Sequence, residues 1–224
     1  MVIGLIGAMN VETELIMNKF EDVTVNQAIG MTFYSGELFN KKVVLVTSSI
    51  GKVNAAICAQ YIIDKYNVST IINTGIAGSL KDDIEINTTI ISNKLTYHDV
   101  RRIQMIESLP NTEFLQTDEY LQTLASKKSV ELSINHIIGD YVTGDSFVNS
   151  KEESDKIKFK YDADCVDMES AAIAHVCHLN MVPFLAIKSI SDNADDKTDE
   201  VLEINRESVA KKSAKLVLEI LKDI

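Results

Sequence analysis

The strongest constraint on the fold is an alternation of apolar runs with helix-like patterns along the whole chain. Apolar runs that indicate strands are followed by segments whose apolar residues repeat at helical spacing. Strand-like patterns cover residues 2–7, 31–39, 43–48, 70–73, 88–95, 136–142 and 184–191. Helical patterns cover residues 11–20, 53–66, 118–127, 152–159, 167–179 and 200–221. This order predicts an α/β fold, a three-layer αβα sandwich around a central mixed, mostly parallel twisted sheet.

The chain shows no boundary between domains. Its 224 residues suit one α/β domain, the only two prolines are Pro110 and Pro183, and no linker rich in Ser and Gly occurs. The least regular stretch, residues 96–117, is expected to be a surface excursion. We therefore expect a single domain over residues 1–224.

Charge and cysteine content exclude several classes of partner. Lys and Arg number 22 against 33 Asp and Glu, which gives a net charge of −11. An acidic surface repels phosphate backbones and anionic lipid, so neither nucleic acid nor membrane is an expected partner. No secretory leader or membrane span is recognised. Three widely spaced cysteines favour reduced thiols, hence a cytoplasmic location.

The candidate site lies where the predicted strands end, because ligands of such sheets bind beyond the carboxyl ends of the strands. The segment 75–78 is expected to be a glycine turn after its strand, and it lacks the third glycine of a dinucleotide motif. The polar candidates at strand ends are Glu12, segments 75–78 and 144–149, Asp167 with Glu169, and Asp192. Their carboxylates could converge on one cleft.

Glu12 and Asp192 are the candidate base and acid. Glu12 falls in the first turn of a predicted helix, where the helix dipole favours a carboxylate. On spacing alone that structural explanation is the stronger one, and the functional alternative is a general base facing the cleft. Asp192 ends an apolar strand, where burial raises a carboxyl pKa and suits a general acid. An ordinary cap between strand and loop explains Asp192 equally well.

Two other groups have residue types that suit a nucleoside. Asp167 is a reasonable helix N-cap, which leaves Glu169 free, and a carboxylate can accept hydrogen bonds from both hydroxyls of a ribose. Phe147 follows a strand and a turn and could stack on a flat base. For Phe147 alone, an ordinary place in the core is the more common outcome.

Neither a metal site nor a triphosphate loop is predicted. His175 and His178 are three positions apart with Cys177 on another side of the helix, and no second ligand pair occurs. Lys52 follows Gly51, but the spacing of a phosphate-binding loop is missing.

Considered jointly, the motifs have a highly specific order and spacing, which extends nearly from end to end. They are IGLIGAM at 3–9 with Glu12, IGKVNAA at 50–56, INTG at 72–75 with Ala77 and Gly78, YHD at 97–99, GDSF at 144–147, Met168 with Glu169, AIAHVCH at 172–178, VPF at 182–184 and ISD at 190–192. In this set the chain resembles the bacterial 5′-methylthioadenosine/S-adenosylhomocysteine nucleosidases, within the purine nucleoside phosphorylase-like superfamily.

The resemblance implies hydrolysis of the N-glycosidic bond of adenine nucleosides that carry a 5′-thio substituent. It implies that Asp192 protonates N7 of adenine and that Glu12 positions and deprotonates the attacking water. Glu169 would bind the ribose hydroxyls, with Met168 packed against the sugar. The other implied substrate-binding residues are Ala8, Met9, Ile50, Gly78, Phe147, Val148 and Ser191.

Three of these residues have an implied role of their own. Phe147 would stack on adenine, Val148 would offer backbone hydrogen bonds, and Ser191 would orient Asp192. The resemblance also implies a cytoplasmic homodimer that acts on a small nucleoside without a cofactor or a metal.

The chain departs from the family pattern at several positions. Lys188 stands where Arg is usual, which predicts a looser ion pair with Glu12, and Asp167 stands where Glu is usual. Residues 100–108 replace an aromatic, glycine-rich segment that in relatives helps to form the dimer contact and the pocket for the 5′ substituent.

Alternatives to a nucleosidase remain open. A phosphorylase needs cations for phosphate, yet the only arginines are Arg101, Arg102 and Arg206, and Glu12 would repel phosphate. Arg101 and Arg102 could bind an acidic 5′ group of another nucleoside. Lys188 and segment 100–108 also leave open a nucleoside-binding paralogue with little catalysis.

Overall fold

The computed structural model describes residues 1–224 as alternating strands and helices. The strands are β1 (Val2–Gly7), β2 (Val23–Ala28), β3 (Met31–Leu38), β4 (Lys41–Thr47), β5 (Thr70–Ser79), β6 (Thr89–Tyr97), β7 (Leu115–Gln116), β8 (His136–Thr143), β9 (Cys165–Asp167) and β10 (Phe184–Asp192). The helices are α1 (Asn10–Met17), α2 (Lys52–Tyr66), α3 (Arg102–Glu107), α4 (Glu119–Glu131), α5 (Lys151–Lys160), α6 (Ser170–Asn180) and α7 (Thr198–Asp223). The predicted α/β class is confirmed.

All ten strands belong to one sheet in the order β10-β6-β8-β9-β5-β1-β4-β3-β2, with β7 paired to β6. Because β10 also pairs with β5, strands β5, β9, β8, β6 and β10 close on themselves in a barrel-like arrangement. An open sandwich was expected, and this closure is the main difference. Five strand pairings are parallel and five are antiparallel, so the sheet is mixed but not mostly parallel.

Part of the antiparallel character comes from β2, a strand the sequence pattern does not predict. It pairs with β3 through a two-residue turn in which Ile29 and Gly30 both have positive φ, 48° and 77°. This is the geometry of a tight hairpin, but the usual Asn-Gly or Asp-Gly signal is absent. The strand lies at the sheet edge and is mostly exposed, so it carries no apolar pattern.

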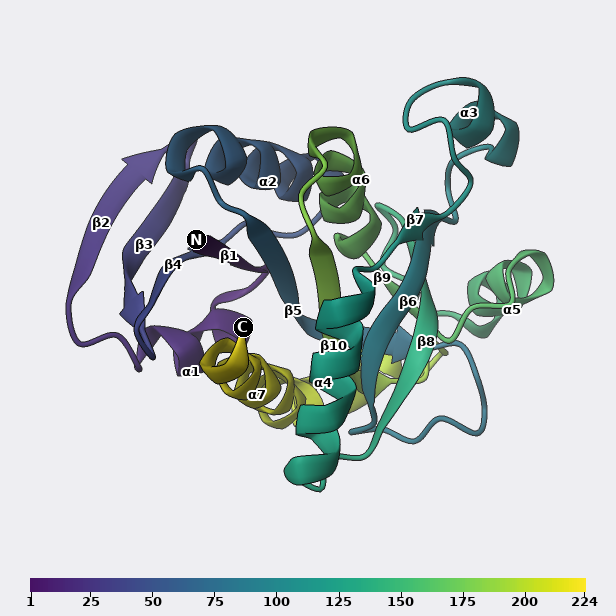
Figure 1. Ribbon diagram of the computed structural model, residues 1–224. Helices are drawn as coiled ribbons and strands as arrows, with labels where there is room; N and C mark the ends of the chain where they lie inside the picture. The colour runs from purple at the N-terminus through teal and green to yellow at the C-terminus, as the bar shows by residue number, and fades with distance from the viewer.

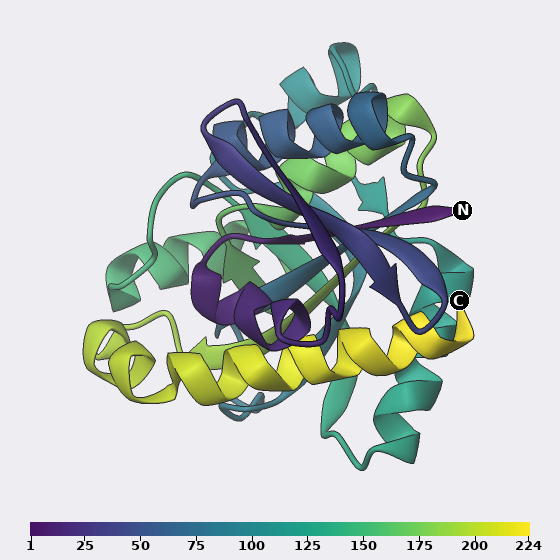
Figure 2. The same ribbon diagram turned by 90° about the vertical axis from the view of Figure 1, so that its left-hand side faces the viewer.

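Helices cover both faces of the sheet (Figures 1 and 2). Helices α2 and α6 pack side by side on one face, and α1, α4 and α7 pack together on the other. Each face has its own apolar cluster, because strands covered on both sides bury alternate side chains in opposite directions. In β4, for example, Val44 and Val46 face α2 and α6, whereas Leu45 faces α7.

Strand β5 is longer than its pattern predicts. A turn was expected at residues 75–78, but the strand continues through them to Ser79 because β10 pairs with it in parallel along this length. In that register Gly75 pairs with Lys188 and Gly78 with Asp192. The two glycines leave room for carboxyl groups, because a Cβ at Gly75 would meet Glu12 and one at Gly78 would meet Asp192. The predicted turn is wrong.

The expected excursion at residues 96–117 contains helix α3 and strand β7. Helix α3 stands off the main body of the molecule (Figure 1). Its Met105 is buried, whereas Ile103 and Ile106 are exposed. None of the helices is long and apolar enough to cross a membrane.

Candidate active site

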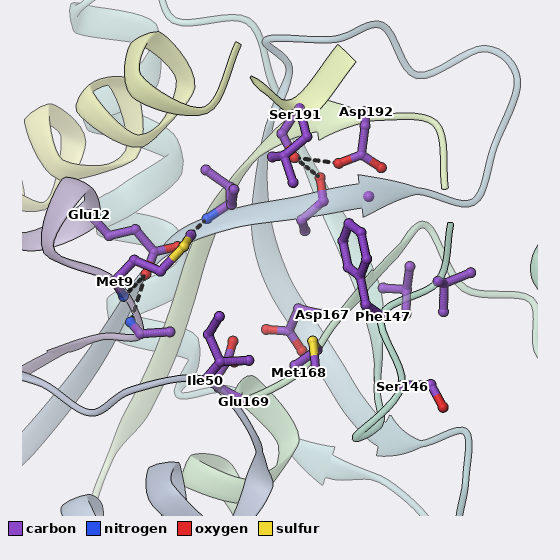
Figure 3. A pocket seen from close by; sticks show the side chains of 17 residues that line it. Met9, Glu12, Ile50, Ser146, Phe147, Asp167, Met168, Glu169, Ser191 and Asp192 are labelled. Atoms are coloured by element: carbon purple, nitrogen blue, oxygen red, sulfur yellow. Dashed lines mark hydrogen bonds between the residues drawn. The ribbon is translucent and has the colours of Figure 1, made fainter. Parts of the chain in front are cut away.

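One pocket gathers residues from the carboxyl ends of β1, β5, β8, β9 and β10 (Figure 3). All eleven predicted site residues line it: Ala8, Met9, Glu12, Ile50, Gly78, Phe147, Val148, Met168, Glu169, Ser191 and Asp192. Six further lining residues had no predicted binding role, although the first three and Asp167 belong to the candidate groups at strand ends: Ile76, Ala77, Ser146, Val166, Asp167 and Leu202.

Glu12 is fixed at one end of the pocket by backbone amides. It is 1% exposed, and its Oε2 accepts hydrogen bonds from the N–H groups of Ala8 at 2.6 Å and Met9 at 2.9 Å. Its Oε1 accepts from the N–H of Ile76 in β5 at 3.0 Å. Glu12 therefore stabilises the start of its own helix and also faces the pocket. The structural and the functional explanation for this residue are compatible.

Glu169 lies on another wall of the pocket. Its Oε1 accepts a hydrogen bond from the N–H of Gly51 at 3.1 Å, and its Oε2 is 3.4 Å from the Nζ of Lys188. Burial raises the pKa of Glu169 to about 7, which the Lys188 ammonium opposes and the Asp167 carboxylate reinforces. The side chain makes no helix-capping bond, so it is available to a ligand.

Asp167 anchors this wall. Its Oδ1 accepts from the Thr143 hydroxyl at 2.6 Å, and its Oδ2 accepts from the N–H of Ser170 at 3.1 Å. The predicted capping role is thus filled two residues before the N-cap position, which Glu169 occupies. Asp167 Oδ2 also lies 3.3 Å from Lys188 Nζ.

Lys188 is a fully buried cation between two carboxylates, Asp167 and Glu169. Burial acts to lower its pKa, but the two carboxylates and Glu12 outweigh that effect and raise the pKa above its ordinary value. No ion pair joins Lys188 directly to Glu12. The ion pair with Glu12 that the resemblance implied is replaced by ion pairs with Asp167 and Glu169.

Asp192 closes the other end of the pocket. Its Oδ2 accepts from the Ser191 hydroxyl at 2.6 Å, and its Oδ1 accepts from the N–H of Ala194 at 2.9 Å and from the Thr198 hydroxyl at 3.3 Å. Burial raises the pKa of Asp192, although these three donors act to lower it. A side chain at Gly78 would approach Asp192 Oδ1 to 2.9 Å, so the glycine gives the carboxyl its room.

Apolar side chains line the space between the carboxylates. Figure 3 shows Phe147 and Met168 on the same side of the pocket as Asp192, with Met9 beside Glu12. Phe147 is 43% exposed and therefore is not a core residue, the common alternative for it. Val148 is buried next to it. A flat, apolar ligand with polar edges suits such a slot.

The unpredicted lining residues had weak signals. Ile76 and Ala77 belong to the part of β5 that was taken for a turn. Leu202 belongs to the first turns of α7, a helix that the sequence analysis did not connect with the site. Asp167 was named among the carboxylates that could converge on one cleft, and the one role predicted for it was a helix cap. All charged lining residues are acidic: Glu12, Asp167, Glu169 and Asp192.

Comparisons with known proteins agree with this fold. The family model of the phosphorylase superfamily matches residues 2–222. A nucleosidase of Staphylococcus haemolyticus, named 5′-methylthioadenosine/S-adenosylhomocysteine nucleosidase, is 38% identical over 99% of each chain. The chain belongs to this family of nucleosidases within the phosphorylase superfamily.

Solved structures are similar over nearly the full chain. The nucleosidase of Neisseria meningitidis in complex with methylthio-immucillin-A has a TM-score of 0.95 and 33% identity, covering 100% of this chain and 99% of that one. The futalosine hydrolase of Helicobacter pylori has a TM-score of 0.94 and 31% identity, covering 100% and 98%.

Proposed function

We propose that the protein hydrolyses the N-glycosidic bond of adenine nucleosides with a 5′-thio substituent, such as methylthioadenosine and S-adenosylhomocysteine, and releases adenine. The observation that carries this proposal is the placement of Glu12 and Asp192 at opposite ends of one pocket, with Glu169 between them (Figure 3). Family membership and the inhibitor named for the Neisseria meningitidis structure support the same substrate class.

Asp192 is the general acid in this proposal. Burial raises its pKa, which favours its role as the acid that gives a proton to N7 of adenine. After transfer, the carboxylate accepts hydrogen bonds from Ser191, Ala194 and Thr198, which stabilise the charge that forms. The leaving adenine is then neutral.

Glu12 is the general base. Three amide N–H groups hold its carboxylate in one orientation and leave a lone pair free to accept a proton from water. The water attacks the anomeric carbon from the side opposite adenine, as in inverting glycoside hydrolysis. Its proton passes to Glu12 as the new C–O bond forms.

Glu169 binds the ribose hydroxyls, and Met168 packs against the sugar. The transition state has the positive charge of an oxocarbenium ion, which the nearby carboxylate stabilises. Phe147 stacks on adenine, with hydrogen bonds from the Val148 backbone. Gly78 lines the ribose side, and Ala8, Met9 and Ile50 complete the substrate contacts, with Met9 and Ile50 at the 5′ end.

Water suits this pocket better than phosphate as the nucleophile. The lining contains four carboxyl groups and no Lys or Arg, and the one adjacent cation, Lys188, is already paired with Asp167 and Glu169. A phosphate would have to displace those partners. Arg101 and Arg102 are exposed and do not line the pocket, and Arg102 forms an ion pair with Glu113 at 2.7 Å.

The test is release of adenine from a panel of nucleosides with and without phosphate. The panel contains methylthioadenosine, S-adenosylhomocysteine, 5′-deoxyadenosine and futalosine, the last because of the Helicobacter pylori neighbour. We expect hydrolysis of the thio-substituted nucleosides without phosphate and a loss of about 10²–10⁴-fold in kcat for Asp192→Asn. Strict dependence on phosphate would point to a phosphorylase. Tight binding without adenine release would point to a binding paralogue.

We also propose that residues 1–224 form one three-layer αβα domain that works as a cytoplasmic homodimer. Helices on both sheet faces support the layering, and three buried free cysteines suit a reducing compartment. The exposed Val53, Ile57 and Ile103 offer apolar area to a second copy. Sedimentation at micromolar concentration tests the dimer.

A further inference from the structure

Lys52 is a prominent side chain that the catalytic scheme leaves unused. It opens helix α2 directly after Gly51, whose N–H donates to Glu169. Although the residue is partly exposed, its Nζ lies within 2.6–2.7 Å of both carboxylate oxygens of Asp99. The ammonium also sits 5.2 Å from the centre of the Tyr97 ring. One lysine is thus held by an anion and an aromatic face.

Asp145 joins the same cluster from the segment that carries Phe147. Its Oδ1 accepts a hydrogen bond from the backbone N–H of Lys52 at 2.8 Å, one of the unpaired amides at the start of α2. Its own N–H donates to Asp99 Oδ2 at 3.0 Å. A carboxylate at this helix end is also favoured by the helix dipole.

Three segments therefore meet at one point. Asp99 follows β6, Asp145 follows β8, and Lys52 begins α2. Two of the segments also reach the pocket, because Phe147 lies two residues after Asp145 and Gly51 immediately precedes Lys52. Contacts within the cluster fix the segment of Asp145 and Phe147 relative to the segment of Gly51 and Lys52.

We propose that Lys52, Asp99 and Asp145 form an ion-pair latch that positions Phe147 over the base and the Gly51 amide against Glu169. The three are positioning residues, since none of them lines the pocket. The inference rests on the proposed nucleosidase function, and it assigns a role to a lysine that resembles only superficially the lysine of a phosphate loop.

Gly51 shows how tightly the latch is built. Its φ is +102°, and a side chain there would come within 3.3 Å of Asp145 Oδ1. The amides of Gly51 and Lys52 follow one another in the chain but donate to two different carboxylates, Glu169 and Asp145. This arrangement uses a backbone conformation at residue 51 that glycine adopts readily.

The test compares Lys52→Met with wild type, with Lys52→Arg as a rescue and Lys156→Met as a control. Lys156 makes an exposed ion pair with Glu152 at 2.7 Å on α5 and lines no part of the active-site pocket. For Lys52→Met we expect KM for methylthioadenosine to rise about tenfold with a smaller change in kcat, because stacking on Phe147 is lost from ground state and transition state alike. Arg should restore most of the affinity, since it can pair with Asp99.

A double-mutant cycle separates a latch from independent surface charges. Lys52→Met combined with Asp99→Asn should raise KM no more than Lys52→Met alone, because both changes break the same contact. Rising salt should raise KM of the wild type and leave Lys52→Met unchanged. An unchanged KM in Lys52→Met, or additive effects of the two substitutions, would overturn the proposal.

Hydrogen exchange tests the latch without any substrate. In Lys52→Met the amides of Gly51, Lys52 and Asp145 should exchange faster, while those of the central strands keep their rates. A wild type that releases no adenine would contradict the proposed function, and the exchange rates would still decide the latch. Unchanged exchange at these three amides would refute it.

Discussion

The carboxylate of Glu12 occupies the space that a side chain at Gly75 would need. A Cβ built on Gly75 would lie 2.2 Å from Glu12 Oε1 and 2.6 Å from its carboxyl carbon. Gly75 also has a φ of +153°, in the range that L-residues rarely adopt. The proposed base is thus pressed against the backbone of a central strand, next to the Ile76 amide that binds it.

Gly75→Ala is therefore expected to displace Glu12 rather than simply to strain the strand. Since a shift of about 1 Å in a catalytic group costs about 10²-fold, we expect a fall of that order in kcat for adenine release. The measurement is steady-state kinetics at saturating methylthioadenosine.

Gly30→Ala is the matched control. Gly30 also has a positive φ, +77°, but a Cβ there meets no atom within 4 Å. Gly30→Ala should lower Tm, because alanine is strained at this φ, and should leave kcat unchanged. If both variants kept wild-type kcat, Glu12 would not be the base in the position described.

All eleven predicted site residues line one pocket, whereas the sheet matches its prediction only in part. The site residues belong to compact motifs at strand ends. Strands β1, β4 and β10 are buried on both faces, so most of their residues are apolar and the strands can be recognised in the sequence. Parallel pairing of β1, β5 and β10 then brings Glu12 and Asp192 to one edge, whereas Glu169 follows β9, which runs antiparallel to β5. Their roles stay predictions until the variants are measured.

Closure of the sheet could not be predicted in the same way. It depends on β10 pairing with β5 on one side and with β6 on the other, and on β9, whose three residues carry no pattern of their own. The pairing of Lys188 with Asp167 and Glu169 is likewise a tertiary contact, because 19 or more positions separate the partners in the chain. The local periodicity of the sequence contains no information on the closure of the sheet or on the ion pairs of Lys188.

The pH dependence of kcat/KM should report Glu169. Its pKa is raised to about 7, and ribose binding needs the ionised form, so activity should rise as pH increases through about 7. The Asp167 charge contributes to that raised pKa. Asp167→Asn should therefore move the acid limb to lower pH, measured as kcat/KM from pH 5 to 9. A limb that stays in place or moves to higher pH would contradict this assignment.

Removal of the buried cation should be costly. Lys188→Met leaves Asp167 and Glu169 without their common partner, and loss of one member of a buried ion pair costs about 3–5 kcal/mol. The folded-state pKa of Glu169 then rises further, because Lys188 acts to lower it, so the deficit should be largest above neutral pH and shrink as pH falls. Denaturant unfolding at pH 5 and pH 8 measures both effects.

A second substitution provides the control for Lys188. Lys188→Met combined with Asp167→Asn removes one charge of each sign and should recover part of the lost free energy of unfolding at pH 8. If the double variant were as unstable as the sum of the single variants, charge pairing would not explain the loss.

Thr198 is expected to tune the acid. Its hydroxyl is 1% exposed and donates to Asp192 Oδ1 at 3.3 Å, a contact that lowers the pKa of Asp192 against the opposing effect of burial. Thr198→Val keeps the shape and removes the donor, so the carboxylate formed by proton transfer is less stable and Asp192 holds its proton to higher pH. We expect kcat to fall about tenfold or more and its basic limb to move to higher pH, because the lost hydrogen bond is one to a charged group. Thr198→Ser, which keeps the hydroxyl, should retain both the rate and the profile, and equal profiles for Val and Ser would exclude this role.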